Sequence, residues 1–259
     1  MNIAILLPYK ENYTKKNAGA VSISVNDTIK LSKYKKNIKV YGYTSSRDRL
    51  NNYKNIHVKK KFFYSTSLQY LNKFFDETKN IKIDILEIHN RPSYVNFVDK
   101  NYNSVKILYF HNDPQSMLGS RTVDERINLL SKTNKIIFNS YWSKSRFLEN
   151  LPNDIILDKL SVIPQSTSKT KINFDKKKKL ISFIGKLNTS KGYDIFGKSI
   201  LKILDGYPDW KSIVIGNELR EKLVFTHKNL SLLGYKKNSY ILSKLKEVSI
   251  SVVPSIWEE

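Results

Sequence analysis

The chain has 259 residues, of which 40% are hydrophobic and 12% aromatic, and it contains no cysteine. This composition is typical of a globular chain long enough for one large domain or two smaller ones, and it excludes disulfides and thiolate metal sites. The net charge of +22 comes mostly from lysines spread over the whole length. Arg-rich clusters with interleaved aromatic residues are missing, so we expect no nucleic acid partner, while peripheral contact with an anionic membrane stays open.

The first half alternates short apolar runs with segments of helical spacing, a rhythm that predicts a parallel sheet flanked by helices. No run approaches the roughly 20 apolar residues of a membrane-spanning helix, and the apolar N-terminus reads as a buried strand. We therefore expect a soluble, cytoplasmic protein that is at most peripheral at the inner face of the membrane. The expected strands are 3–7, 38–43, 83–88, 105–110 and 135–138, and the expected helices are 20–34, 68–79, 93–100, 123–133 and 143–150.

A polar, Ser/Thr-rich stretch that ends in a lysine run, residues 164–179, predicts a linker between two domains, 1–163 and 180–259. After it the same rhythm restarts. The expected strands there are 180–184, 212–216, 231–234 and 248–254, and the expected helices are 193–204 and 240–246. We thus expect an α/β protein with two Rossmann-like domains, of which the second, with only four strands, is incomplete.

Three motifs in the first half stand where strands end. Gly19 and Ala20 follow the first strand and open a helix, so the backbone can approach a ligand closely and its free amides face outward. His89 and His111 each follow a strand-like run, and ligands of such sheets bind at the carboxyl ends of strands. Ser143, at the start of a predicted helix, fits an ordinary N-cap better than a nucleophile, since no GxSxG turn occurs.

The most informative segment is ISFIGKLNTSKG, which ends at Gly192. A buried strand that breaks at Gly185 and leads towards a helix brings backbone amides and the ammonium groups of Lys186 and Lys191 to one rim. Such a rim suits a diphosphate. The pattern is neither GxxxxGK[ST] nor GxGxxG.

This segment resembles the G-[RK]-L-x(4)-KG motif of nucleotide-sugar glycosyltransferases of family 4, and other segments match the family in the same order. The resemblance implies the GT-B fold and retaining transfer of a sugar from a nucleotide-diphosphate donor to a saccharide, a lipid or another hydroxyl acceptor. It implies no metal and no cofactor other than the donor. The matching segments are Gly19–Ala20, His111, 138–144, 214–217, 233–235 and 253–259.

The resemblance also implies roles for particular residues. His111 would line the donor sugar pocket, Lys186 and Lys191 would stabilise the leaving diphosphate, and Glu259 would face donor sugar hydroxyls as the first glutamate of an E-x(7)-E motif. The donor phosphates and nucleotide would contact Gly19, Ala20, Gly185, Gly216, Asn217 and Gly234, and the acceptor side would be formed by His89, Asn90 and Arg91.

The sequence departs from the family pattern where it stops. The second glutamate would lie beyond Glu259, so the chain is interpreted as about two-thirds of a typical member, truncated near the start of that motif. Two alternatives stay open. One is a truncated, non-catalytic nucleotide-sugar-binding module, and the other is a basic protein that binds membrane surfaces or polyanions through charge alone.

Overall fold

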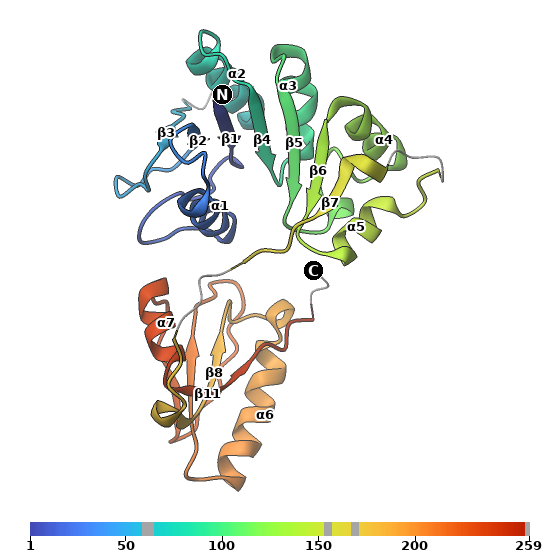
Figure 1. Ribbon diagram of the computed structural model, residues 1–259. Coiled ribbons are helices and arrows are strands. Elements are labelled where there is room, and N and C mark those ends of the chain that lie inside the picture. Colours follow the sequence, from blue (N-terminus) through green and yellow to red (C-terminus); the bar gives the residue numbers. More distant parts are fainter. Residues whose placement is uncertain (59–64, 153–156, 167–170, 257–259) are drawn as a thin grey trace. The chain divides into compact units, whose positions relative to one another are not determined.

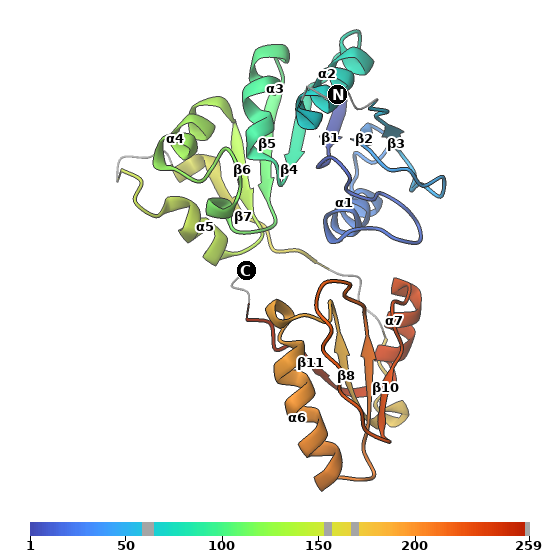
Figure 2. The same cartoon turned by 180° about the vertical axis from the view of Figure 1, so that it is seen from behind.

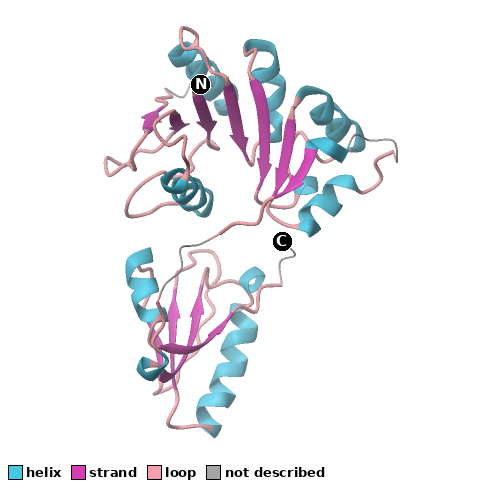
Figure 3. Cartoon of the chain, viewed as in Figure 1, coloured by secondary structure: helices cyan, strands magenta, loops and turns pink. Residues whose placement is uncertain are grey.

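The computed structural model of the chain describes residues 1–58, 65–152, 157–166 and 171–256 (Figure 1). The chain divides into two compact units, residues 1–168 and 169–258. Each unit contains one parallel sheet with helices packed against it (Figure 3). The predicted α/β architecture of two parallel-sheet units is confirmed.

The first unit is built on a seven-stranded parallel sheet in the order β3-β2-β1-β4-β5-β6-β7. The order runs outward from β1 in both directions, as in a doubly wound fold. The strands are β1 (Ile3–Leu6), β2 (Ile38–Gly42), β3 (Tyr53–Asn55), β4 (Ile85–His89), β5 (Val105–Phe110), β6 (Lys135–Phe138) and β7 (Leu160–Val162).

Helices cover both faces of this sheet, and alternate residues of the strands point to each face. On β1, Ile5 packs with Val21, Val25 and Ile29 of α1 on one face. Leu6 belongs to the other cluster, which is formed with the remaining helices. Figure 2 shows the same sheet and its helices from behind. The helices are α1 (Ala20–Leu31), α2 (Thr66–Thr78), α3 (Val95–Asn101), α4 (Val123–Lys132) and α5 (Tyr141–Leu148).

Among the described residues of this unit, the sequence prediction found the five α-helices and five of the seven strands. The two missed strands, β3 and β7, have three residues each. Three residues are too few to establish a period-2 pattern, and these strands form because neighbours already in the sheet offer free backbone groups at its edges. Val40 to Gly42 pair with β3, and Ile136 to Phe138 pair with β7.

The second unit contains a four-stranded parallel sheet in the order β10-β9-β8-β11. Tyr193, Phe196, Ile200 and Leu204 of its long helix α6 bury one side chain per turn against the sheet. The elements are β8 (Lys178–Ile184), α6 (Tyr193–Gly206), β9 (Lys211–Ile215), β10 (Leu230–Leu232), α7 (Asn238–Leu245) and β11 (Val248–Val252).

The predicted linker is too long at its carboxyl end. A 3₁₀ turn forms at Phe174–Lys176, and β8 begins at Lys178, inside the expected linker. The lysine run belongs to the fold because its ammonium groups have local acceptors. Lys177 donates to the carbonyls of Leu245 and Val248, and Lys178 pairs with Glu247 at 2.8 Å.

Candidate active site

The two histidines predicted at strand ends are in direct contact. Strands β4 and β5 are neighbours, and His89 lies opposite Tyr109 in their register. His111 is the first residue after β5 and therefore lies close to His89. The Nδ1 of His89 lies 2.7 Å from the Nε2 of His111. Both side chains are interior, with 3% and 6% of the residue surface exposed.

Each histidine also has a hydrogen-bond partner at its other ring nitrogen. The other ring nitrogen of His89, Nε2, lies 2.5 Å from the Glu87 carboxylate, and the other ring nitrogen of His111, Nδ1, lies 2.5 Å from the side-chain amide of Gln165. Glu87, His89, His111 and Gln165 form a continuous hydrogen-bonded chain, which we call the histidine relay. Burial, with the neighbouring His89 as a smaller cause, lowers the pKa of His111 to about 3.

Tyr109 fixes the orientation of both imidazole rings. Its ring stacks on His111 at a centroid distance of 4.5 Å and on His89 at 5.4 Å, with interplanar angles of 19° and 9°. Its hydroxyl donates to the carbonyl of Ile163 at 2.5 Å, and burial raises the pKa of Tyr109 to about 12. A rotation of either imidazole would therefore break a stacking contact as well as a hydrogen bond.

Asn90 and Arg91, expected on the acceptor side, form the turn that follows β4. Asn90 adopts the left-handed conformation with φ of 53°, which asparagine tolerates better than most residues. Its side-chain oxygen accepts from the backbone amide of His111 at 3.1 Å, and its carbonyl accepts from Arg91. The turn thus fixes the backbone of His111. Both ring nitrogens of the neighbouring His89 are engaged in hydrogen bonds within the relay.

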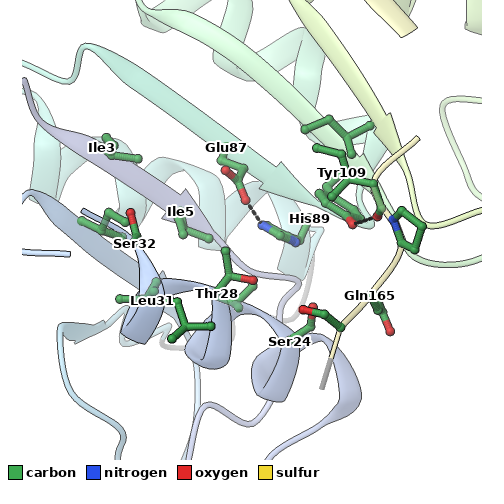
Figure 4. Close-up of a pocket in the computed structure, with 17 residues that line it drawn as sticks. Ile3, Ile5, Ser24, Thr28, Leu31, Ser32, Glu87, His89, Tyr109 and Gln165 are labelled. Carbon is green, nitrogen blue, oxygen red and sulfur yellow. Dashed lines mark hydrogen bonds and ion pairs between the residues drawn. The ribbon is translucent and has the colours of Figure 1, made fainter. Parts of the chain in front are cut away.

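A cavity of about 530 Å³ lies on the face of the sheet that α1 partly covers. Figure 4 shows the Glu87 carboxylate bonded to the His89 ring on the wall opposite Ser24 and Thr28 of α1. The cavity is mainly apolar away from this wall. The apolar lining residues include Ile3, Ile5, Val25, Ile29, Leu31, Ile38, Ile137 and Ile163.

The glycine-bearing turn before α1 differs from the expectation of outward-facing free amides. The Gly19 amide donates to the carbonyl of Asn12, and the Ser22 amide donates to the Glu11 carboxylate at 3.0 Å. That carboxylate lies where a Cβ of residue 19 would be. Gly19 therefore makes room for an acidic side chain at the start of α1, and Ala20 is the first residue of that helix.

Ser143 is not the N-cap that the sequence predicted. Helix α5 begins at Tyr141, its N-cap is Ser140, and Ser143 is the third helical residue of a reciprocal capping box. The Ser143 hydroxyl also donates to the side chain of Asn139 at 2.8 Å. Its contacts explain it as a structural residue.

In the second unit, three strand-end glycines predicted to face the donor lie side by side. The Gly185 amide donates to Ile215, and the Gly216 amide donates to Gly234, each at 3.0 Å. A Cβ on Gly216, whose φ is 150°, would overlap the carbonyl oxygen of Gly185. Asn217, next in the chain, is exposed. A glycine thus follows each of three neighbouring strands, β8, β9 and β10, at the carboxyl edge of this sheet.

The loop after Gly185 carries both predicted lysines, Lys186 being exposed and Lys191 half-buried. Asn188 starts a 3₁₀ turn, and its side chain accepts from the Lys191 amide at 3.1 Å. Gly192 then adopts φ of 68° and serves as the N-cap of α6. The polar cap and the glycine explain why the chain can turn here from β8 into α6.

Two glutamates of the next strand-end loop contact this turn. The Glu221 carboxylate accepts from the Thr189 amide at 2.9 Å, and Glu218 accepts from the Asn188 side chain at 3.2 Å. Hydrogen bonds from the amides of Arg220 and Leu219 and the charge of Lys186 lower the pKa of Glu218. Carboxylates therefore lie beside the positions expected to bind phosphate.

The segment that leads to Glu259 also meets the lysine-bearing loop. The Ile256 amide donates to the Ser190 carbonyl at 3.2 Å, and the Ser255 hydroxyl to the same oxygen at 3.3 Å. Glu259 itself lies outside the described residues.

Sequence reasoning missed Glu87, Gln165, Glu218 and Glu221. Glu87 carried a usable signal, because it stands two residues before His89 on one strand and so shares its face of the sheet. Gln165 lies in the predicted linker, and the two other glutamates lie in a polar loop. No pattern in the sequence distinguishes these three from ordinary surface residues.

The second unit matches a known protein family. Residues 164–259 match the family model of glycosyl transferases group 1. An uncharacterized glycosyltransferase of Methanocaldococcus jannaschii is 28% identical to this chain over 199 residues, which are 73% of this chain and 46% of that protein. The match therefore spans about half the length of this relative.

Solved structures share the fold of the whole chain. Sucrose-phosphate synthase of Thermosynechococcus elongatus superposes with a TM-score of 0.72 at 9% identity, over 100% of this chain and 76% of its own. HepE of Anabaena, solved in complex with UDP and glucose, gives 0.66 at 12% identity, over 97% and 74%. The fold is that of the GT-B glycosyltransferases. Within the described part of the chain, no helix has the length and apolarity needed to cross a membrane.

Proposed function

We propose that the chain carries the donor site of a retaining glycosyltransferase of family 4, of the hexosyltransferase type, which transfers a sugar from a nucleotide diphosphate to a hydroxyl of a saccharide or lipid-linked acceptor. One observation carries the proposal. Gly185, Gly216 and Gly234 follow three neighbouring strands at the carboxyl edge of the second sheet, and Lys186 and Lys191 lie in the loop after Gly185. This edge belongs to the part of the chain that matches the family model.

The chemistry follows from where charge develops. As the glycosidic bond of the donor breaks, the leaving nucleoside diphosphate gains negative charge, and fixed cations and backbone amides stabilise that change. Ammonium groups at Lys186 and Lys191 supply the positive charge that a metal supplies in other enzymes. The diphosphate itself accepts the proton of the attacking hydroxyl, and therefore this reaction needs no pair of carboxylates.

His111 is the contribution of the first unit to this proposal. It lies at the end of β5, at the carboxyl edge of the sheet, where ligands of such folds bind. Its depressed pKa keeps the imidazole neutral at pH 7. A neutral imidazole hydrogen-bonds sugar hydroxyls without adding positive charge next to the reacting carbon, and Asn90 and Arg91 form the adjacent turn for the acceptor side.

The basic surface supports a further part of the proposal, peripheral contact with an anionic membrane on the cytoplasmic side. A net charge of +22 attracts anionic lipid over a Debye length of about 8 Å at physiological salt. Such contact would bring the chain to lipid-linked acceptors. Cosedimentation with vesicles of phosphatidylglycerol, but not of phosphatidylcholine, tests it, and insensitivity to salt would contradict it.

Binding of nucleotide-sugars tests the donor site directly. Calorimetric titration with UDP-, ADP- and GDP-linked hexoses should identify one binding donor. Lys186→Ala and Lys191→Ala should each weaken it about 10-fold, since hydrogen bonds to charged groups contribute about 1.5–3 kcal/mol. Lys202→Ala, which removes an exposed lysine within α6, is the matched control and should leave the affinity unchanged. Unchanged affinity in both loop variants would remove the lysines from the site.

The retaining stereochemistry has its own measurement. The anomeric configuration of the new glycosidic bond, read by proton NMR of the product, should equal that of the donor. An inverted product would contradict the assignment to family 4 and leave the donor site intact.

A further inference from the structure

The histidine relay has a single direction of proton donation. An ionised carboxylate only accepts hydrogen bonds, so the Nε2 of His89 carries the proton that bonds Glu87. A neutral imidazole has one N–H, so the Nδ1 of His89 accepts and the Nε2 of His111 donates to it.

The remaining ring nitrogen of His111, Nδ1, also has a defined role as donor or acceptor. With the proton of His111 on Nε2, its Nδ1 is an acceptor, and the side-chain amide of Gln165 donates to it. Each of the three hydrogen bonds thus has one donor and one acceptor when Glu87 is ionised and both imidazoles are neutral. The opposite tautomer of His111 would set two N–H groups against each other at Gln165, or would require the amide to turn over.

We propose that Glu87 and His89 are positioning residues that hold His111 in the Nε2–H tautomer, so that its Nδ1 is presented as an acceptor to a substrate hydroxyl that replaces Gln165. The nature of that hydroxyl, a sugar hydroxyl of the donor, rests on the function proposed above. The tautomer does not, because it follows from the contacts of Glu87, His89 and Gln165 alone.

The surroundings of the relay suit such a role. Tyr109 stacks on both imidazoles and blocks their rotation, and the Asn90 side chain fixes the backbone of His111. The Glu87 side chain is 24% exposed and lines the cavity, so solvent keeps its carboxylate hydrated, whereas the rings beyond it are buried. The Glu87 end of the relay is therefore in contact with solvent, whereas the His111 ring that it positions is buried.

The order of polar groups also explains why Gln165 is a suitable temporary partner. Its amide N–H offers Nδ1 what a sugar O–H would offer, a neutral donor at hydrogen-bond distance. Its hydrogen bond to His111 satisfies a buried acceptor that would otherwise cost free energy when no ligand is bound. Exchange of one neutral donor for another leaves the rest of the relay undisturbed.

NMR of chain labelled with ¹⁵N-histidine reads the tautomers without any need for activity. The four histidines are separated with the variants His57→Gln and His227→Gln. At pH 7 both His89 and His111 should show the Nε2–H pattern. A proton on Nδ1 of His111, or a doubly protonated ring, would overturn the proposal.

The variant Glu87→Leu tests the positioning role, because it removes the acceptor and keeps the volume of the side chain. We expect His89 and His111 to become tautomer mixtures, and kcat for the donor identified by titration to fall roughly 10- to 100-fold, with KM nearly unchanged. Glu77→Leu is the matched control, since Glu77 has a similar exposure of 27% and pairs with Lys54 and Lys73 of the same unit instead.

Each outcome decides one claim. If Glu87→Leu keeps both tautomers in a folded chain, as judged by its circular dichroism, the positioning role is wrong. If the variant does not fold, the tautomers of the wild-type chain still decide. If the wild-type chain has the expected tautomers and binds no nucleotide-sugar, the proposed function fails and the relay stands.

Discussion

The Cα of Gly192 is packed against the carbonyl of Pro254. A Cβ added at residue 192 would lie 1.9 Å from the Pro254 oxygen, and the backbone φ of 68° is itself one that glycine favours. This contact joins the lysine-bearing loop to the segment after β11. The loop and that segment therefore form one structure at the carboxyl edge of the second sheet.

We predict that Gly192→Ala destabilises the second unit by about 1–3 kcal/mol, since a left-handed alanine is strained and the Pro254 carbonyl has to move. Urea unfolding followed by tryptophan fluorescence, to which Trp210 of this unit contributes, measures the loss. Gly206→Ala is the control, because no atom lies within 4 Å of its added Cβ at the end of α6, and it should change stability by less than about 1 kcal/mol. Equal stabilities of the two variants would contradict the packing of residue 192.

His111 should make the stability of the first unit depend on pH. Above about pH 6.5 this imidazole is neutral in the folded and unfolded chain and contributes no pH dependence. As pH falls from 6.5 towards the folded pKa of about 3, the unfolded chain takes up a proton that the folded chain does not, so stability is lost in that window. The groups that face His111 are His89, Tyr109 and Gln165, with Glu87 beyond His89.

Between about pH 7.5 and pH 5 the wild-type chain should lose about 2 kcal/mol more than His111→Gln, as follows from the two pKa values. Chemical unfolding at both pH values gives the difference, and the variant subtracts the contribution of all other titrating groups. Parallel pH profiles for the two proteins would show that His111 titrates normally in the folded state.

Glu221 should oppose the binding of a diphosphate, because its carboxylate occupies the Thr189 amide beside the expected phosphate position. Glu221→Gln keeps a hydrogen-bond acceptor and removes the charge. We expect UDP to bind about 5-fold more tightly, equivalent to roughly 1 kcal/mol for two unit charges about 4 Å apart in water. Glu247→Gln is the control, since Glu247 precedes β11 at the opposite edge of the sheet. Weaker binding in Glu221→Gln would show that this carboxylate supports the site.

The sequence predicted the fold well because long elements carry strong periodicity. In β5 and α6 the apolar spacing alone sets the boundaries closely, since Val105–Phe110 matches the expected range and α6 begins at Tyr193 as expected. β3 and β7 could not be predicted, because they depend on pairing with β2 and β6 and not on a pattern of their own.

The candidate site was predictable in part. Glycines and lysines at strand ends are local signals, and Gly185, Gly216 and Gly234 do lie together. The carboxylates at Gly19 and Thr189 were not predictable, since Glu11 and Glu221 reach those positions through the folding of their loops. The relay between Glu87 and Gln165 likewise joins residues 78 positions apart in the chain, which only tertiary structure brings together.

The last prediction concerns metal ions. If Lys186 and Lys191 offset the charge of the leaving diphosphate, excess EDTA should change the affinity for the donor and its turnover by less than about 2-fold. The double variant Lys186→Ala/Lys191→Ala provides the comparison, because it removes both lysine charges and so tests whether added Mg²⁺ can replace them. Turnover by the wild-type chain that stops in EDTA and returns with Mg²⁺ would assign this role to a metal and contradict the lysine mechanism. Turnover that persists in EDTA and is lost in the double variant is the result that we expect.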